Sequence, residues 1–426
     1  DAEDARAELT GLLRSFFESS QAHVAGGGRV APALAAAVTP GLGKTSTTLR
    51  LLAEFAPAFL PEGHVAVYVP TLDLADRAYA DFVRLAPDVP ARVLRGRDAS
   101  HPLTGVRMCE RPDIARRIAP VVPSVTSVIC KRARGRRAPC AVACSYLEQR
   151  PETNSVLFLA HSYLTATPPV GGPVALQIVD EKVWPALIGV REVTLEDWLL
   201  PPAAGLHRDL EQHHRQVRYR AAEALQTREC PVEALRCAGL TSALIGALAA
   251  HEFETAPSLD LQPEMPRETT RQVVEEFDFG LWALRTGRGQ ILRYLAQALD
   301  TAASARLTLA TRNGSEGSRQ VLRLHKLRKL NADIPTLLLD ADADPEIVEQ
   351  IRPGTAYARV SVAPKAKVVQ AVDRTLSNAW LLDKSRGKDR MDRVLRIVRR
   401  EVEGASPSGV LLVATKDVLH ALHAQA

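Results

Sequence analysis

The chain has 426 residues, and 54 lysines and arginines against 49 aspartates and glutamates give it a formal net charge of +5. This length allows two or three domains, and an apolar content of 46% excludes a disordered or collagen-like chain. No apolar run approaches the length of a membrane span, and the first residues do not form a signal peptide. We therefore expect no membrane partner and a reducing, cytoplasmic location.

The chain opens with a predicted helix and a flexible joint. Leu9, Leu12, Leu13, Phe16 and Phe17 recur with helical spacing, which predicts an amphipathic helix with one apolar face. Three glycines at 26–28 then separate this helix from the first predicted strand.

A phosphate-binding loop follows that strand. Residues 33–38 predict a buried strand and the spacing after residue 46 predicts a helix, which is the strand–loop–helix setting of a P-loop. Glycines let backbone N–H groups turn toward phosphate oxygens, Lys44 reaches the β- and γ-phosphates, and the Thr45 hydroxyl holds Mg²⁺. Val38 stands where the strict motif has its first glycine, and an ordinary glycine-rich turn is the alternative. We expect ATP and Mg²⁺ at Thr39, Gly41, Gly43, Lys44 and Thr45.

Further strands predict a parallel sheet with an acidic pair at its edge. Residues 65–69 predict a strand that ends in Pro70-Thr71, and residues 156–160 and 174–179 predict two more. The last of these runs into Asp180-Glu181. Downstream of a P-loop, we expect Asp180 to hold Mg²⁺ through water and Glu181 to polarise the attacking water.

Residues 105–150 break the alternation of strands and helices and predict an inserted metal-binding segment. It contains Cys109, Cys130, Cys140 and Cys144. Thiolates bind iron–sulfur clusters and zinc alike, and the spacing does not choose between them. Four unconnected, buried cysteines are the alternative.

The later part of the chain predicts a helical segment and then more α/β structure. Residues 190–303 have helical periodicity, and within them Cys230 and Cys237 are expected to be core residues. Residues 336–339 predict a strand that runs into Asp340, and residues 409–415 predict another. A complete second α/β lobe needs on the order of 150 residues, so we expect only its beginning after residue 362.

Two basic stretches are candidate nucleic-acid contacts, because guanidinium and ammonium groups neutralise phosphates. For either stretch alone, a solvated basic face is an equally good interpretation. The first contains Arg132, Arg134 and Arg136, and the second contains Arg319, Arg323, Lys326, Arg328 and Lys329.

The order of these segments resembles a helicase family. The P-loop, Val-Pro-Thr-Leu-Asp-Leu-Ala at 69–75, the cysteines, Ala-His-Ser-Tyr-Leu at 160–164 and Val-Asp-Glu at 179–181 are similar in order to the iron–sulfur superfamily 2 helicases of the XPD/DinG type. Phage and plasmid replication helicases related to them are similar too. The resemblance spans most of residues 5–345. It implies single-stranded DNA contacts at Pro70 and Thr71, a helical arch at 190–303, and a 4Fe-4S cluster ahead of zinc. For His161 it implies a DNA contact or a coupling role, with a satisfied histidine at a strand end as the alternative.

The sequence departs from that family at two segments. The acidic box is Asp180-Glu181-Lys182-Val183, without the family's Ala-His, and Asp340-Ala341-Asp342 stands in place of a Ser-Ala-Thr segment. Because the box carries hydrolysis in that family, we expect the coupling of hydrolysis to DNA to differ.

The sequence therefore predicts an α/β protein with a RecA-like P-loop lobe, two insertions and the incomplete start of a second RecA-like lobe. We expect an ATP-dependent DNA helicase or translocase that moves on single-stranded DNA, with further domains or replication proteins as partners. A DNA-packaging ATPase that does not unwind and a non-hydrolysing nucleic-acid-binding module are the alternatives. The expected segments are the lobe at 1–104, 151–190 and 304–362, the cysteine-rich insertion at 105–150, the arch at 191–303, and the second lobe at 363–426.

Overall fold

The computed structural model describes residues 1–426 except 132–134, 136, 167–169, 302–305, 315–316, 364–376, 384, 406–413 and 426. The chain divides into two units, Asp1–Val362 and Ala363–Ala426, which are described separately. Three of the predicted nucleic-acid contacts, Arg132, Arg134 and Arg136, lie outside the described residues.

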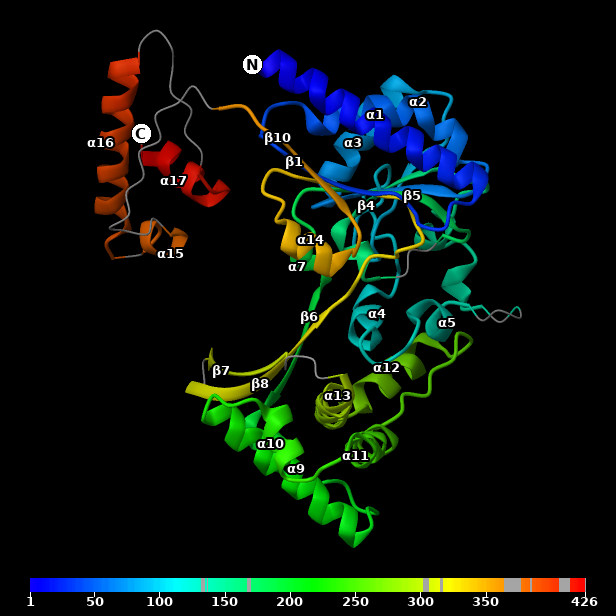
Figure 1. The fold of residues 1–426 in the computed structure, drawn as a ribbon, viewed down its shortest axis with the longest axis vertical. Helices are drawn as coiled ribbons and strands as arrows, with labels where there is room; N and C mark the ends of the chain where they lie inside the picture. Colours follow the sequence, from blue (N-terminus) through cyan, green and yellow to red (C-terminus); the bar gives the residue numbers. More distant parts are fainter. Residues whose placement is uncertain are drawn as a thin grey trace. The chain divides into compact units, whose positions relative to one another are not determined.

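A seven-stranded sheet lies at the centre of the first unit, with the strand order β10-β1-β9-β5-β2-β4-β3 (Figure 1). Every neighbouring pair is parallel, which places all the carboxyl ends of the strands at one edge. This confirms the predicted α/β fold with a RecA-like P-loop lobe. The strands are β1 (Ala33–Val38), β2 (His64–Val69), β3 (Ala91–Val93), β4 (Val156–Ala160), β5 (Val174–Asp180), β9 (Thr336–Asp340) and β10 (Ala356–Val360).

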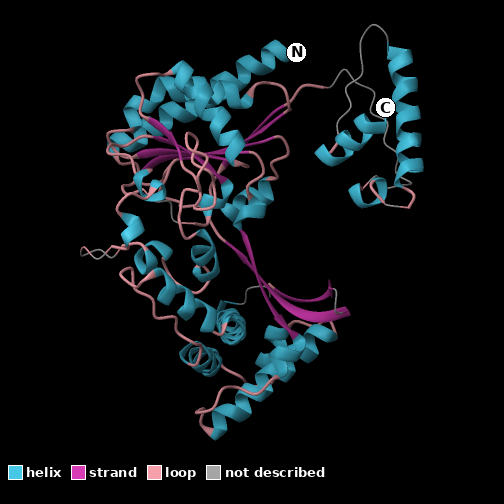
Figure 2. Ribbon diagram, turned by 180° about the vertical axis from the view of Figure 1, so that it is seen from behind, coloured by secondary structure: helices cyan, strands magenta, loops and turns pink. Residues whose placement is uncertain are grey.

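Helices cover both faces of this sheet, which is why its strands are apolar almost throughout (Figure 2). One face packs on α1 (Ala2–Gly26), α2 (Lys44–Phe59) and α3 (Leu72–Leu85). The other packs on α7 (Trp184–Leu187) and α14 (Pro345–Ile351). The predicted amphipathic helix is α1, and its Phe17 ring stacks on Phe55 of α2 with 5.4 Å between ring centroids.

An antiparallel ribbon connects the sheet to a helical subdomain. Strand β6 (Ile188–Thr194) pairs with β8 (Gly317–Leu327), which pairs with β7 (Leu307–Gly314). The helices are α8 (Leu195–Leu199), α9 (Arg208–Gln226), α10 (Pro231–Cys237), α11 (Ser242–Glu254), α12 (Arg267–Glu276) and α13 (Phe279–Thr301).

Two predictions for this region are wrong. Residues 307–327 were assigned to the lobe, but Leu307, Leu322 and Leu324 pack in the core of the helical subdomain, because β7 and β8 pair with β6 and not with the central sheet. Cys230 and Cys237 were expected in the core, but both thiol-bearing residues are exposed, one just before α10 and the other at its end.

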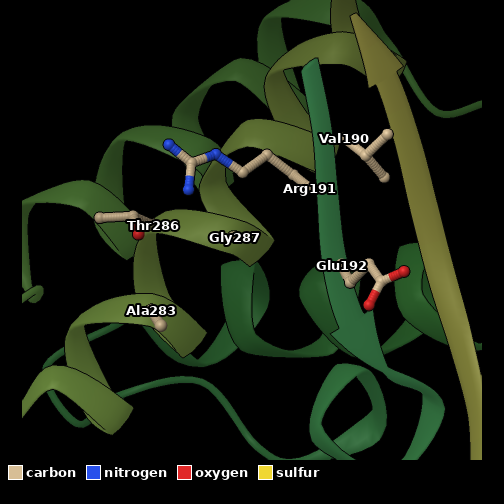
Figure 3. Close-up of a pocket in the computed structure, with 6 residues that line it drawn as sticks. All are labelled: Val190, Arg191, Glu192, Ala283, Thr286 and Gly287. Atoms are coloured by element: carbon tan, nitrogen blue, oxygen red, sulfur yellow. The ribbon is translucent and has the colours of Figure 1, made fainter. Parts of the chain in front are cut away.

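Helix α13 crosses β6 closely at Gly287. A Cβ atom at that position would lie 2.8 Å from Cγ2 of Val193, so a larger residue would push the helix from the strand. Beside this crossing a groove of about 270 Å³ is lined by Val190, Arg191, Glu192, Ala283, Thr286 and Gly287 (Figure 3).

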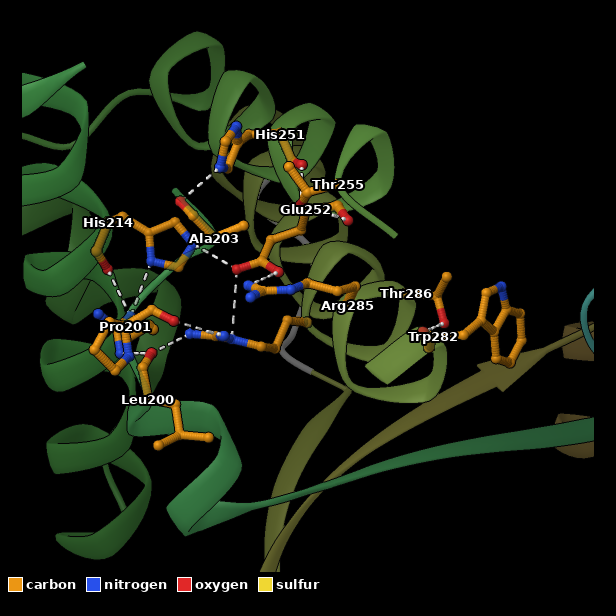
Figure 4. A network of polar contacts seen from close by, with 12 residues as sticks. Leu200, Pro201, Ala203, His214, His251, Glu252, Thr255, Trp282, Arg285 and Thr286 are labelled. Carbon is orange, nitrogen blue, oxygen red and sulfur yellow. Dashed lines mark hydrogen bonds and ion pairs between the residues drawn. The ribbon is translucent and has the colours of Figure 1, made fainter. Parts of the chain in front are cut away.

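A buried charge network joins three helices of the subdomain (Figure 4). Glu252 of α11 accepts from His214 Nε2 of α9 at 3.0 Å and from Arg285 Nη1 of α13 at 3.1 Å, and Arg288 Nε lies 3.5 Å away. Arg218 Nε donates to His214 Nδ1 at 2.9 Å. That bond fixes the neutral tautomer of His214 with its proton on Nε2, and burial lowers the pKa of His214 accordingly.

Acid should weaken the fold through its buried neutral histidines. A histidine whose pKa is lowered on folding stays unprotonated, while the unfolded chain takes up a proton below about pH 6.5, so the free energy of unfolding falls as pH falls. We expect His214→Gln to flatten this dependence by at most about 1.4 kcal/mol per pH unit. Unfolding monitored from pH 8 to pH 5.5 tests this, and identical slopes for the two proteins would contradict it.

The cysteine-containing segment packs against the helical subdomain. Its elements are α4 (Pro112–Ile118), α5 (Val125–Ile129), the 3-10 turn η1 (Pro139–Ala141) and α6 (Ser145–Glu148). Ile118, Ile129 and Cys130 share an apolar cluster with Val274 of α12, and the Arg117 guanidinium lies 4.8 Å from the centre of the Phe279 ring.

The second unit is helical in its described residues. It contains α15 (Asn378–Leu381), α16 (Gly387–Ala405) and α17 (Lys416–Gln425). Residues 409–413 of the strand predicted there lie outside the described residues. Within the described part of the chain, no single helix is long and apolar enough to cross a membrane, although the bent pair α10 and α11 passes by length and composition.

Candidate nucleotide site and cysteine cluster

The P-loop lies at the carboxyl end of β1, where two glycines adopt a conformation that other residues rarely take. Gly41 has φ 86° and Gly43 has φ 85°. Gly43 is the N-cap of α2 and gives it no side-chain cap, so the first N–H groups of this helix are available to an anion. The Thr39 hydroxyl instead accepts from the Val362 N–H at 3.1 Å, which ties the loop to the end of β10.

The predicted catalytic side chains of the P-loop and the acidic box meet at this edge. The Lys44 ammonium lies 2.5 Å from Oε1 of Glu181 and 3.5 Å from Oδ1 of Asp180. The Thr45 hydroxyl donates to Oδ2 of Asp180 at 2.7 Å. The side chains of Lys44 and Asp180 are 12% and 11% exposed, whereas Glu181 is 45% exposed and can reach a solvent molecule.

Asp180 has the properties of a cation ligand. Burial raises the pKa of Asp180, against the opposing effects of Lys44 and Thr45. Its Oδ1 atom is buried and accepts no hydrogen bond in the described residues. A buried carboxylate oxygen beside a threonine hydroxyl is a donor set that suits Mg²⁺, because hard cations prefer oxygen ligands. The residues present therefore fit the metal that a P-loop uses.

Glu181 is held in the left-handed backbone region. Its φ of 67° is unusual for a residue with a side chain, and such a conformation costs on the order of 1–3 kcal/mol. The Glu181 N–H donates to the Leu339 carbonyl at 2.7 Å, so β9 holds this turn in place. The strain sits where the chain leaves the sheet and turns the carboxylate toward Lys44.

His161 contacts the backbone of the acidic box. It begins the 3-10 turn η2 (His161–Leu164) after β4, and its Nε2 donates to the Asp180 carbonyl at 2.9 Å. The ring is buried, and burial lowers the pKa of His161. The sequence predicts a DNA contact or a coupling role for this residue. The ring is satisfied by the Asp180 carbonyl at the end of a strand, and its burial leaves a direct DNA contact without support.

Asp340 is an edge residue that the sequence interpretation did not assign to the site. It ends β9 opposite Ala37 of β1, and β9 lies between the P-loop strand and the strand of Asp180. The residue is buried, and its Oδ2 has no hydrogen-bond partner in the described residues. The sequence signal for Asp340 is an apolar strand that ends in an acidic residue. This signal does not show that the Asp340 side chain is buried.

The predicted nucleic-acid contacts are only partly brought together. Pro70 and Thr71 are exposed at the carboxyl edge after β2, and the Thr71 hydroxyl caps α3 through the Leu74 N–H at 3.3 Å. In the second basic stretch, Arg323 is bound to Glu192 at 2.6 Å and Arg328 to the Thr165 carbonyl at 2.7 Å. These two arginines are therefore engaged within the protein.

The four cysteines of the inserted segment lie in one neighbourhood. Cys109, Cys130 and Cys144 are buried and Cys140 is partly exposed. Burial raises the pKa of the Cys130 and Cys140 thiols, and the Cys109 and Cys144 thiols add to both shifts. No group of three or more His, Cys, Asp or Glu side chains in the described residues stands in metal-binding geometry. The donor chemistry suits a metal, but the sulfurs would have to converge further to bind one.

Arg97 occupies the space beside two of these thiols. Its Nη1 lies 3.4 Å from the Cys130 sulfur and 3.7 Å from the Cys109 sulfur, and its guanidinium stacks 4.1 Å from the centre of the Tyr146 ring. Burial opposes the charge, yet the Cys130 thiol and the Tyr146 hydroxyl raise the pKa of Arg97. The Arg97 cation opposes the effect of burial on Cys130, but burial prevails and the pKa of that thiol stays raised.

Comparison with known proteins adds little beyond this geometry. No family model matches the chain, and no curated protein matches it. Among solved structures, a truncated XPD is similar, with 12% identity over 84% of this chain and 99% of that chain and a TM-score of 0.34. A TM-score of this size supports no conclusion about the site.

Proposed function

We propose that the protein is an ATP hydrolase that couples hydrolysis to movement on single-stranded DNA, as a superfamily 2 helicase or translocase. The convergence of Lys44, Thr45, Asp180 and Glu181 at the carboxyl edge of a parallel sheet carries this proposal. The order of motifs along the chain, which resembles iron–sulfur helicases, supports the nucleic-acid part of it.

The side chains divide the work of hydrolysis. The N–H groups of the P-loop and α2 bind the phosphates, and Lys44 moves from the two carboxylates to the β- and γ-phosphate oxygens. Release from Lys44 leaves the exposed Glu181 carboxylate free to orient and deprotonate the attacking water. Thr45 and Asp180 would hold Mg²⁺, which would neutralise charge on the phosphates. His161 keeps the Asp180 backbone in position.

Phosphate release in the presence of Mg²⁺ and oligo(dT) tests this function. We expect hydrolysis that oligo(dT) stimulates, and a Glu181→Gln variant that binds ATP but hydrolyses it at least about 100-fold more slowly. Binding without hydrolysis would favour the non-hydrolysing module. Stimulated hydrolysis without separation of a forked duplex would favour a translocase that does not unwind.

We further propose that Cys109, Cys130, Cys140 and Cys144 hold a 4Fe-4S cluster, with zinc as the alternative. The support is a set of four thiols in one neighbourhood and the Arg97 cation beside two of them. A cluster would crosslink the segment, and the Arg97 cation would offset its negative charge.

Metal analysis of protein purified without oxygen tests the cysteine site. We expect about four iron and four sulfide per chain, lost together in Cys109→Ser and in Cys144→Ser. Cys237→Ser is the matched control, because that cysteine is exposed on another helix, and it should retain all the metal. Zinc in place of iron would select the alternative, and protein without either metal would contradict the proposal.

A further inference from the structure

We propose that the groove between β6 and α13 binds a phosphodiester of a single-stranded nucleic acid, with Arg191 as its anion contact. This inference rests on the proposed function, because it names a place where the strand is held. It adds a contact in the helical subdomain that the motifs of the sequence do not include.

Arg191 is directed into the groove and has no partner there. Its register partner is Leu324 and that of Val193 is Leu322, so alternation along β6 places Arg191 on the face that packs on α13. Figure 3 shows its side chain extending from β6 across Gly287 toward Thr286. In the described part of the chain, no carboxylate or carbonyl pairs with its guanidinium.

The neighbouring acidic residue does not neutralise this arginine. Figure 3 shows that the Glu192 carboxylate points away from Arg191, toward β8. There it lies 2.6 Å from Arg323 and 3.3 Å from Arg312, so its charge is already matched by two cations. The groove is therefore left with a net positive wall.

The core beneath the groove adds to the positive potential. Arg285 and Arg288 stand on either side of Thr286 and Gly287 in α13, and with Arg218 they interact with the carboxylate of Glu252. The carboxylate of Asp197 also acts on Arg288, so with His214 neutral the three arginines face two carboxylates and one positive charge is in excess. In a poorly solvated interior such an excess acts over longer distances than it would in water.

The other walls suit a sugar–phosphate chain more than an apolar ligand. Ala283, Thr286 and Gly287 present little side-chain bulk to the groove. Lys326 lies two residues beyond Leu324 on the same face of the ribbon, opposite Gly189 and about 7 Å along it. Lys326 does not line the groove, but it is a second exposed cation along this face of the ribbon, and two cations in a row match a strand with repeated phosphates better than a lone phosphate ion.

Salt-dependent binding of fluorescein-labelled oligo(dT) by the full chain tests this assignment. Losing one phosphate contact lowers the slope of log K against log salt by about 0.7 for a single strand, which is about a fivefold loss of affinity at 0.1 M salt. We expect this loss in Arg191→Ala. Ala283→Phe, which fills the groove without changing charge, should weaken binding to a similar extent.

Arg215→Ala is the matched control, because Arg215 is an exposed arginine of the same subdomain that does not line the groove. It should keep the affinity and slope of the wild type. An unchanged slope of log K against log salt in Arg191→Ala, or an equal loss of affinity in Arg215→Ala, would overturn the assignment of strand binding to the groove. Either result would leave the proposed function intact. Wild-type protein that binds inorganic phosphate but no oligo(dT) would overturn both the strand assignment and the DNA part of the proposed function.

Discussion

Replacement of Lys44 by alanine should lower the affinity for ATP by about 100-fold, or about 2.7 kcal/mol, and abolish hydrolysis. The Lys44 ammonium is nearly buried and is held between Asp180 and Glu181, at the N-terminus of α2. Its removal takes away the cation that contacts the phosphates. It also leaves two carboxylates without a counter-charge, and these repel the incoming phosphates.

Calorimetric titration with ATP and Mg²⁺ measures this effect, and unfolding curves confirm that the variant is folded. Arg50→Ala is the matched control, because it removes an exposed cation from the same helix and should leave the affinity within about twofold. If Lys44→Ala bound ATP as tightly as the wild type, nucleotide binding would have to be assigned to another part of the chain.

The geometry of the proposed nucleotide site could be predicted because the residues that form it are largely close in sequence. Gly41, Gly43 and Lys44 lie within four positions of each other. Together they indicate the backbone conformation and the positive charge that phosphate binding needs. Asp180 lies far away in sequence but at the end of an apolar strand. In a parallel sheet all such ends meet at one edge, so the topology alone brings it to the P-loop.

The partners of these residues could not be predicted in the same way. The role of the His161 ring depends on where the Asp180 carbonyl lies in the fold. Arg97 approaches Cys130 only after the chain folds back on itself. The pairing of β6 with β8 joins residues that are separated by more than 100 positions. Local periodicity contains no information about such contacts, which explains why 307–327 was assigned to the wrong part of the fold.

The buried network of the helical subdomain shows the same limit. Glu252 lies near the end of the apolar helix α11. Its neighbours in sequence do not reveal that its side chain is fully buried. Three arginines and a histidine reach it from two other helices. The Glu252 carboxylate therefore joins α9, α11 and α13 through contacts that lie beside their shared apolar core.

Glu252→Gln should destabilise the helical subdomain by about 3–5 kcal/mol, because removing one member of a buried ionic network leaves the remaining charges uncompensated. Burial works against the ionised carboxyl, yet His214 and Arg288 hold the pKa of Glu252 below its usual value, so the residue is charged at neutral pH. Burial lowers the pKa of Arg288 to about 10, and loss of the carboxylate would lower it further.

Hydrogen exchange of the α9, α11 and α13 amides measures this loss locally, so that unfolding of the sheet does not obscure it. Glu254→Gln is the matched control on the same helix, because its side chain is exposed, and it should change protection by less than about 0.5 kcal/mol. Equal protection in both variants would mean that apolar packing around the network, and not the carboxylate, holds the three helices together. Because Lys44, Asp180 and Glu181 lie at the central sheet and not in this subdomain, the variant should bind ATP normally and bind oligo(dT) more weakly.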